Sequence, residues 1–215
     1  MAIFLLKNSR LQKKNYYTEL FGLSRSGKSS LLREIGKIKE KRVYALKLNI
    51  FKKLFYLIKF TIKNPFKTVI LFSKTNLNWI YLNELNFFEY IKIFLMRNSY
   101  LIHVLAKYEI INKKNCYVDE FIMQSIFMII QKKSNKKEIL SLLKTLPLSG
   151  KILLIEKSKK ERYERINRTR YPAEQINKFF AVKWMDNMEF NYKILRKILF
   201  ENYGPAILIK RLDQL

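Results

Sequence analysis

The sequence has few cysteine, glycine, proline and acidic residues for its length of 215 residues. Cys116 is the only cysteine, which excludes an internal disulfide, a cysteine-based zinc cluster and a redox pair. Asp and Glu total 17 against 43 Lys and Arg, giving a formal charge of +26. This excess favours polyanionic partners, namely nucleotides, nucleic acids or anionic lipid surfaces. A composition rich in Lys, Asn, Ile and Phe is also what an AT-rich genome encodes without selection for binding.

Long apolar runs are also missing. The apolar start at residues 1–6 meets Lys7 and Arg10 too soon for a signal-peptide core, and no later run approaches the length that spans a bilayer. Together with the single cysteine, this predicts a cytoplasmic protein. Since 49% of the residues are hydrophobic and 14% aromatic, the chain is not a disordered one. We expect a single domain over residues 1–215.

The clearest motif in the sequence lies at residues 22–29, Gly-Leu-Ser-Arg-Ser-Gly-Lys-Ser. These residues fit the pattern of a phosphate-binding loop (P-loop, Walker A). The loop lies between a strand-like segment, 16–21, and a helix-like segment, 29–35. Its glycines allow a tight turn in which backbone N–H groups face phosphate oxygens, at the positive end of the following helix. The pattern therefore predicts nucleotide binding; the alternative is a loop that has kept the pattern and lost the nucleotide.

Each position of this loop has an expected role with ATP and Mg²⁺. Lys28 should reach the β- and γ-phosphates, and the Ser29 hydroxyl should coordinate Mg²⁺. Arg25 either adds positive charge to the loop or faces solvent. The predicted nucleotide-binding residues are Gly22, Ser24, Arg25, Ser26, Gly27, Lys28, Ser29 and Ser30.

Two carboxylates follow the strand-like segment 115–118. An acid at the end of a buried strand beside the P-loop strand is expected to bind Mg²⁺, and this predicts Asp119 as the second metal-side residue. Glu120 would face the same cleft and accept a proton from an attacking hydroxyl or water. Gln124, one helical turn further on, would orient an acceptor or cap the helix. The alternative for the Asp-Glu pair is a solvated turn.

Strand-like and helix-like segments alternate along the chain. This alternation predicts an α/β fold with a doubly wound, parallel, five-stranded sheet flanked by helices, in which ligands bind outside the carboxyl ends of the strands. The basic helices 51–62 and 66–72 belong to a predicted helical lobe, 50–112. The expected strands are 16–21, 42–48, 115–118, 150–155 and 179–184, and the remaining expected helices are 82–95, 100–111, 121–131, 137–146 and 188–203.

Arginines recur every three residues after the fourth expected strand, at Arg162, Arg165 and Arg168. Guanidinium groups stabilise charge on a phosphoryl group in transfer, provided that a closing segment brings them over the site. The spacing places them near one helical face. We therefore predict a lid at residues 157–175; the alternative is a basic helix that is solvated or binds nucleic acid.

The order of these parts resembles the nucleoside and nucleotide kinase superfamily of P-loop proteins, and looks most like its thymidylate-kinase-like branch. The resemblance rests on residues 22–29, on 118–120 with Gln124, and on 147–155 followed by 161–170. It implies ATP-dependent phosphoryl transfer with an acid after the third strand and an arginine-bearing lid after the fourth. Thymidylate enzymes carry Asp-Arg where this chain has Asp-Glu at 119–120, so the resemblance leaves the acceptor open.

The sequence thus predicts an ATP-dependent kinase acting on a small acceptor, with Lys28, Glu120 and the three lid arginines as catalytic residues. Its basic, apolar lobe would suit a phosphorylated, nucleotide, or lipid- or glycan-linked acceptor, and also peripheral contact with an anionic membrane. The alternatives are a P-loop ATPase switch acting on a protein, or a nucleic-acid-binding protein. The absence of an Asn-Lys-x-Asp motif disfavours a GTPase, and the oligomeric state is open.

Overall fold

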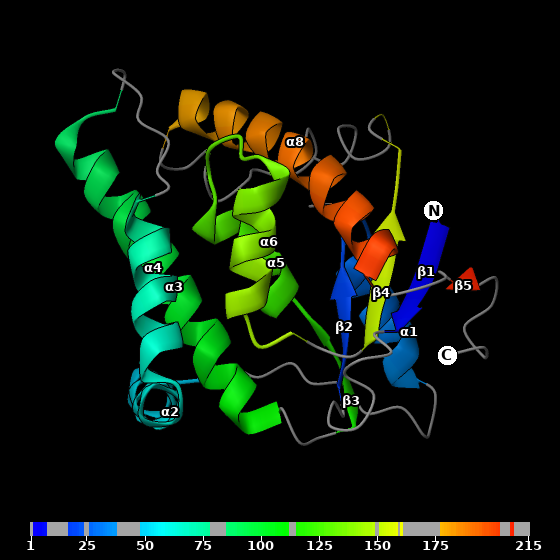
Figure 1. Cartoon of the computed structure of the whole chain (residues 1–215), viewed down its shortest axis with the longest axis horizontal. Coiled ribbons are helices and arrows are strands. Elements are labelled where there is room, and N and C mark those ends of the chain that lie inside the picture. Colours follow the sequence, from blue (N-terminus) through cyan, green and yellow to red (C-terminus); the bar gives the residue numbers. More distant parts are fainter. Residues whose placement is uncertain are drawn as a thin grey trace.

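A computed structural model describes residues 2–7, 17–23, 26–37, 48–77, 85–111, 115–148, 151–158, 160, 177–202 and 207–208. Within these ranges the chain is a mixed α/β structure, with a sheet at one end and a group of helices at the other (Figure 1). The strands are β1 (Ala2–Lys7), β2 (Tyr17–Phe21), β3 (Cys116–Asp119), β4 (Lys151–Glu156) and β5 (Ile207–Leu208). The helices are α1 (Lys28–Lys37), α2 (Ile50–Lys63), α3 (Pro65–Leu77), α4 (Phe87–Ile111), α5 (Ile122–Ile129), α6 (Lys136–Thr145) and α8 (Lys178–Asn202).

The strands are ordered β3-β2-β4-β1-β5 in the sheet. β2 is parallel to both β3 and β4, whereas β1 is antiparallel to β4, and the two-residue β5 is antiparallel to β1. In the register of the parallel part, Leu20 lies opposite Asp119 on one side and Leu153 on the other. The loop that follows β2 therefore begins beside the carboxyl end of β3.

Three of the expected strands are confirmed as β2, β3 and β4, but the prediction of a wholly parallel sheet is wrong because β1 runs antiparallel along the edge of β4. The expected strand 179–184 is also wrong, since these residues belong to α8. Phe180 and Trp184 are buried while Val182 between them is exposed, which is helical rather than strand spacing. Residues 42–47 of the expected strand 42–48 lie outside the described residues.

The helices agree better with the sequence. α2 and α3 cover the two expected basic helices, and Pro65 occupies the first position of α3, where the missing N–H costs nothing. The two helices expected between residues 82 and 111 are one continuous α4 in the described part of the chain. α6 begins with a capping box in which Asn135 accepts from the Glu138 N–H at 2.9 Å.

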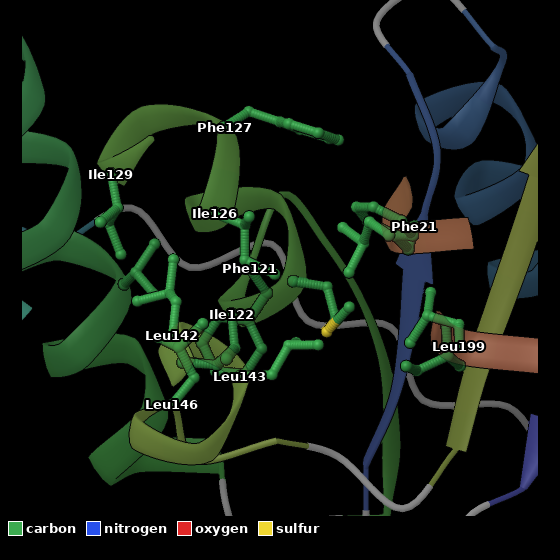
Figure 2. Close-up of a cluster of buried hydrophobic side chains, with 14 of the residues drawn as sticks. Phe21, Phe121, Ile122, Ile126, Phe127, Ile129, Leu142, Leu143, Leu146 and Leu199 are labelled. Carbon is green, nitrogen blue, oxygen red and sulfur yellow. The ribbon is translucent and has the colours of Figure 1, made fainter. Parts of the chain in front are cut away.

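Helices cover both faces of the sheet, because alternate residues of a strand point to opposite sides. From β2, Tyr17 and Phe21 enter the larger core, where Phe21 stacks on Phe127 of α5 at 5.7 Å between ring centroids (Figure 2). Leu20 instead enters a smaller core formed with Leu31 of α1 and its neighbours. The glycine-rich loop (residues 22–29) thus connects a strand and a helix that are each held by their own buried contacts.

Candidate functional site

The glycine-rich loop needs both of its glycines for backbone reasons. Gly27 has a φ of 101°, a conformation that side-chain-bearing residues rarely adopt. A Cβ on Gly22 would lie 2.4 Å from the Ile155 carbonyl oxygen, so β4 leaves no room for a side chain there. The Ser26 N–H donates to the Leu23 carbonyl at 3.2 Å, closing a tight turn before α1 begins at Lys28.

Lys28 lies at the centre of this loop. Its side chain is buried, and Nζ donates to the carbonyl oxygens of Gly22 at 3.0 Å and Leu23 at 3.2 Å. Burial lowers the pKa of Lys28, while the nearby carboxylates of Asp119 and Glu120 act in the opposite direction. Backbone carbonyls of the loop therefore hold the Lys28 ammonium group, and this group is partly desolvated where an anion would approach it.

Ser29 and Asp119, which the sequence predicted as the metal-side pair, lie next to each other. The Ser29 hydroxyl donates to Asp119 Oδ2 at 2.8 Å, joining the first turn of α1 to the end of β3. Ser29 is exposed and Asp119 is buried, so the pair lies at the edge of the buried interior. The parallel register of β2 and β3 is the cause, because it places both strand ends at the same edge of the sheet.

These two oxygen donors suit Mg²⁺, which usually takes one or two protein oxygens and completes its coordination with water and phosphate. The described residues contain no group of three or more His, Cys, Asp or Glu side chains arranged to hold a metal ion. A hydroxyl and a single carboxylate are not such a group. The pair offers at most two protein ligands, so a cation bound there would take its other ligands from water or from a bound anion.

Glu120 is exposed and has a φ of 50°, the left-handed region in which a non-glycine residue is uncommon. Its N–H donates to Asp119 Oδ1 at 2.7 Å, so the turn after β3 fixes the Asp119 carboxylate from the side opposite Ser29. Backbone strain of this kind often accompanies functional sites. The Glu120 side chain lies near enough to Lys28 to act toward a higher pKa of that lysine.

Glu19 and Lys107 form a buried layer behind this pair that the sequence analysis missed. Glu19 Oε1 accepts from the N–H groups of Met123 at 2.6 Å and Gln124 at 3.4 Å, while Oε2 has no hydrogen-bond partner among the described residues. Lys107 Nζ donates to the Asp119 carbonyl at 3.1 Å. Glu19 shares the strand parity of Tyr17 and Phe21, a signal that it would be buried.

This arrangement changes the role of Gln124. Its N–H belongs to the first turn of α5, and Glu19 from β2 accepts it in the manner of a helix cap, because Phe121 at the start of α5 makes no side-chain cap bond. The Gln124 Oε1 atom is buried with no hydrogen-bond partner among the described residues. The expected helix-capping role thus belongs to Glu19.

Glu19 should make the stability of the chain depend on pH. Burial raises its pKa from 4.5 to about 8, against the opposing effects of the Met123 and Gln124 N–H groups and Lys107. Between these values the folded chain keeps a proton that the unfolded chain has lost. The contribution of Glu19 to the free energy of unfolding is therefore fully present below pH 4.5 and is lost, by on the order of 5 kcal/mol, as the pH rises to about 8.

Glu19→Gln should remove this fall, because an amide does not titrate. Urea unfolding of both proteins at several pH values between 5 and 8 should show the wild-type free energy dropping relative to that of the variant. Parallel curves for the two proteins would mean that Glu19 titrates normally.

Of the remaining predicted residues, the structure describes Ser26 and Ser30. Ser30 is exposed in the first turn of α1, and Ser26 is buried with no hydrogen-bond partner for its Oγ among the described residues. Ser24 and Arg25 lie outside the described residues, as do the lid arginines Arg162, Arg165 and Arg168 and all of the predicted lid (157–175) except residues 157, 158 and 160.

Comparisons with known proteins add nothing to this geometry: no family model, no curated protein and no solved structure matches the chain. The fold and the site therefore define a mixed α/β protein that has a glycine-rich loop, a buried lysine and a serine–aspartate pair at one sheet edge.

Proposed function

We propose that the chain is an ATP-dependent kinase with a P-loop fold, which transfers a phosphoryl group to a small acceptor. The observation that carries the proposal is the contact between Ser29 Oγ and Asp119 Oδ2 at 2.8 Å, directly beside a lysine held in a glycine-rich turn. These are residues from distant parts of the chain that phosphoryl-transfer sites bring together.

The triphosphate would bind where α1 begins. The first N–H groups of a helix have no partners within the helix, and together with the helix dipole they favour an anion. Lys28 would exchange its two neutral carbonyl acceptors for phosphate oxygens, which form stronger charge-assisted hydrogen bonds. The basic net charge of the chain supports the approach of such a polyanion.

Ser29 and Asp119 would hold Mg²⁺, which when bound neutralises charge on the transferring group. Three hydrogen bonds hold Asp119 in place for this role. The Glu120 N–H and the Ser29 hydroxyl donate to its two carboxylate oxygens, and Lys107 donates to its backbone carbonyl. Glu120 projects from the next position and would take the proton of the acceptor hydroxyl. In this proposal the lid arginines, as predicted from sequence, neutralise the moving phosphoryl group.

The experiment is to follow ADP release from Mg-ATP in the presence of nucleosides, nucleoside monophosphates and sugar phosphates, each compared with no acceptor. A kinase releases ADP in step with a phosphorylated product, and only when one acceptor is present. Release that ignores every acceptor but rises with an added protein or nucleic acid would replace the kinase by an ATPase switch. No release under any condition would also contradict the proposal.

A further inference from the structure

Helix α2 exposes an apolar face that no described part of the chain covers. Figure 1 places α2 and α3 at the end of the molecule away from the sheet. The exposed fraction of the large apolar side chains on α2 ranges from 44% at Leu54 to 79% at Phe51. Soluble proteins seldom expose large apolar side chains together in this way without a function for them. The α2 face consists of Ile50, Phe51, Leu54, Phe55, Ile58 and Ile62.

This face is not the side of α2 that packs in the core. At about 100° per residue, its six positions fall within an arc of about 140°. Leu57 and Phe60, which are partly and fully buried, lie outside that arc, and Phe60 contacts Tyr108 of α4 at 5.9 Å between ring centroids. The exposed and the buried apolar positions thus lie on adjoining sides of the helix, and only the Leu57–Phe60 side packs against the core.

Helix α3 continues the pattern after a single intervening residue, Asn64. Its buried residues Thr68, Leu71 and Thr75 lie on the side facing the other helices. Its opposite side is apolar and exposed and consists of Phe66, Val69, Ile70 and Leu77.

The charges around these faces have one sign. Residues 41–83 include no Asp or Glu. Lys52 and Lys59 are exposed and border the α2 face on the helical wheel, and Lys67 borders the α3 face in the same way. Lys63, on the same border of α2, forms an ion pair with Glu109 at 2.5 Å, so its charge is already matched. An occupant of this surface must therefore accept apolar side chains in the middle and supply negative charge at the edges.

We propose that α2 and α3 bind the surface of an anionic lipid bilayer. The exposed phenylalanines and isoleucines would enter the boundary between headgroups and acyl chains, and the bordering lysines would contact lipid phosphates. A second copy of the chain fits less well, because pairing these faces would bring two lysine borders and two chains of charge +26 together. No helix in the part that the structure describes is long and apolar enough to cross a membrane, so contact is with the surface only. This inference does not depend on the proposed kinase activity.

The test is co-flotation of the full chain with vesicles of phosphatidylcholine alone or with added phosphatidylglycerol. The wild type should float with the anionic vesicles and much less with the neutral ones, with binding that weakens as salt rises. Phe51→Ser with Phe55→Ser should weaken binding roughly tenfold or more, and Lys52→Gln with Lys59→Gln roughly fivefold for each lysine. The matched control is Phe179→Ser with Val182→Ser, because these α8 side chains are 70% and 62% exposed outside the α2 and α3 faces.

Circular dichroism of each variant establishes that it is folded, and acceptor-dependent ADP release in solution tests the kinase proposal separately. Equal flotation of the wild type and the Phe51/Phe55 variant would overturn the membrane proposal. So would sedimentation showing a wild-type dimer that this variant dissociates, since the apolar faces would then be a subunit interface.

Discussion

Replacing Lys28 with alanine is expected to abolish turnover of Mg-ATP while the chain stays folded. The side chain donates to the carbonyls of Gly22 and Leu23, and burial already disfavours its charge, so its removal costs the fold little. The substrate, in contrast, loses a charge-assisted bond. We expect roughly 10- to 100-fold weaker nucleotide binding and a turnover reduced by about 10²–10³. Calorimetry and ADP release measure the two effects.

Lys37→Ala is the matched control, because Lys37 is an exposed lysine in the last turn of the same helix. Both variants should unfold at nearly the wild-type temperature, and Lys37→Ala should bind and turn over ATP normally. A Lys28→Ala protein with wild-type turnover would limit this lysine to holding the loop closed.

Asp119→Asn should weaken the binding of Mg²⁺ and lower the turnover that depends on it. The amide keeps the size of the carboxylate and can still accept from the Ser29 hydroxyl, but it lacks the negative charge that a hard cation requires. We expect turnover to fall by about 10²–10³ at any magnesium concentration. Titration of Mg²⁺ against the protein with a non-hydrolysable ATP analogue should show correspondingly weaker binding of the metal.

Asp186→Asn provides the control for this substitution, since Asp186 is an exposed aspartate on α8. It should retain the wild-type response to Mg²⁺. If Asp119→Asn also retains that response, Asp119 serves only to fix Ser29 and the Glu120 turn, and the metal site lies elsewhere.

The sequence was sufficient for the parts of the fold in which a local signal and the tertiary structure agree. β2 and α1 follow from a short apolar run and a helical apolar pattern on either side of the glycines. Residues 179–184 were wrongly predicted as a strand because a short aromatic and β-branched run is compatible with either a strand or a buried helix. α8 continues far beyond this run on its C-terminal side, and its long-range packing decided the outcome. The antiparallel β1 had no turn signal to mark it.

The contact between Ser29 and Asp119 was predictable from the sequence, whereas the buried residues behind it, Glu19 and Lys107, were not. The proximity of Ser29 and Asp119 follows from one rule, that parallel strands end at the same sheet edge. Lys107 is one of 43 basic residues, and nothing local distinguishes it from those on the surface. Its burial against Asp119 depends on how α4 packs. Glu19 was recognisable in principle from its strand parity, but in a five-residue strand a single polar residue is a weak signal.

The most direct test of the account is calorimetric titration of the wild-type protein with ATP in the presence and absence of Mg²⁺. We expect saturable binding of one nucleotide per chain, tighter with the metal, and stabilisation of about 2.7 kcal/mol when the free ligand is at about 100 times its Kd. A folded protein that takes up neither ATP nor GTP with magnesium present, and whose unfolding temperature neither nucleotide raises, would contradict it.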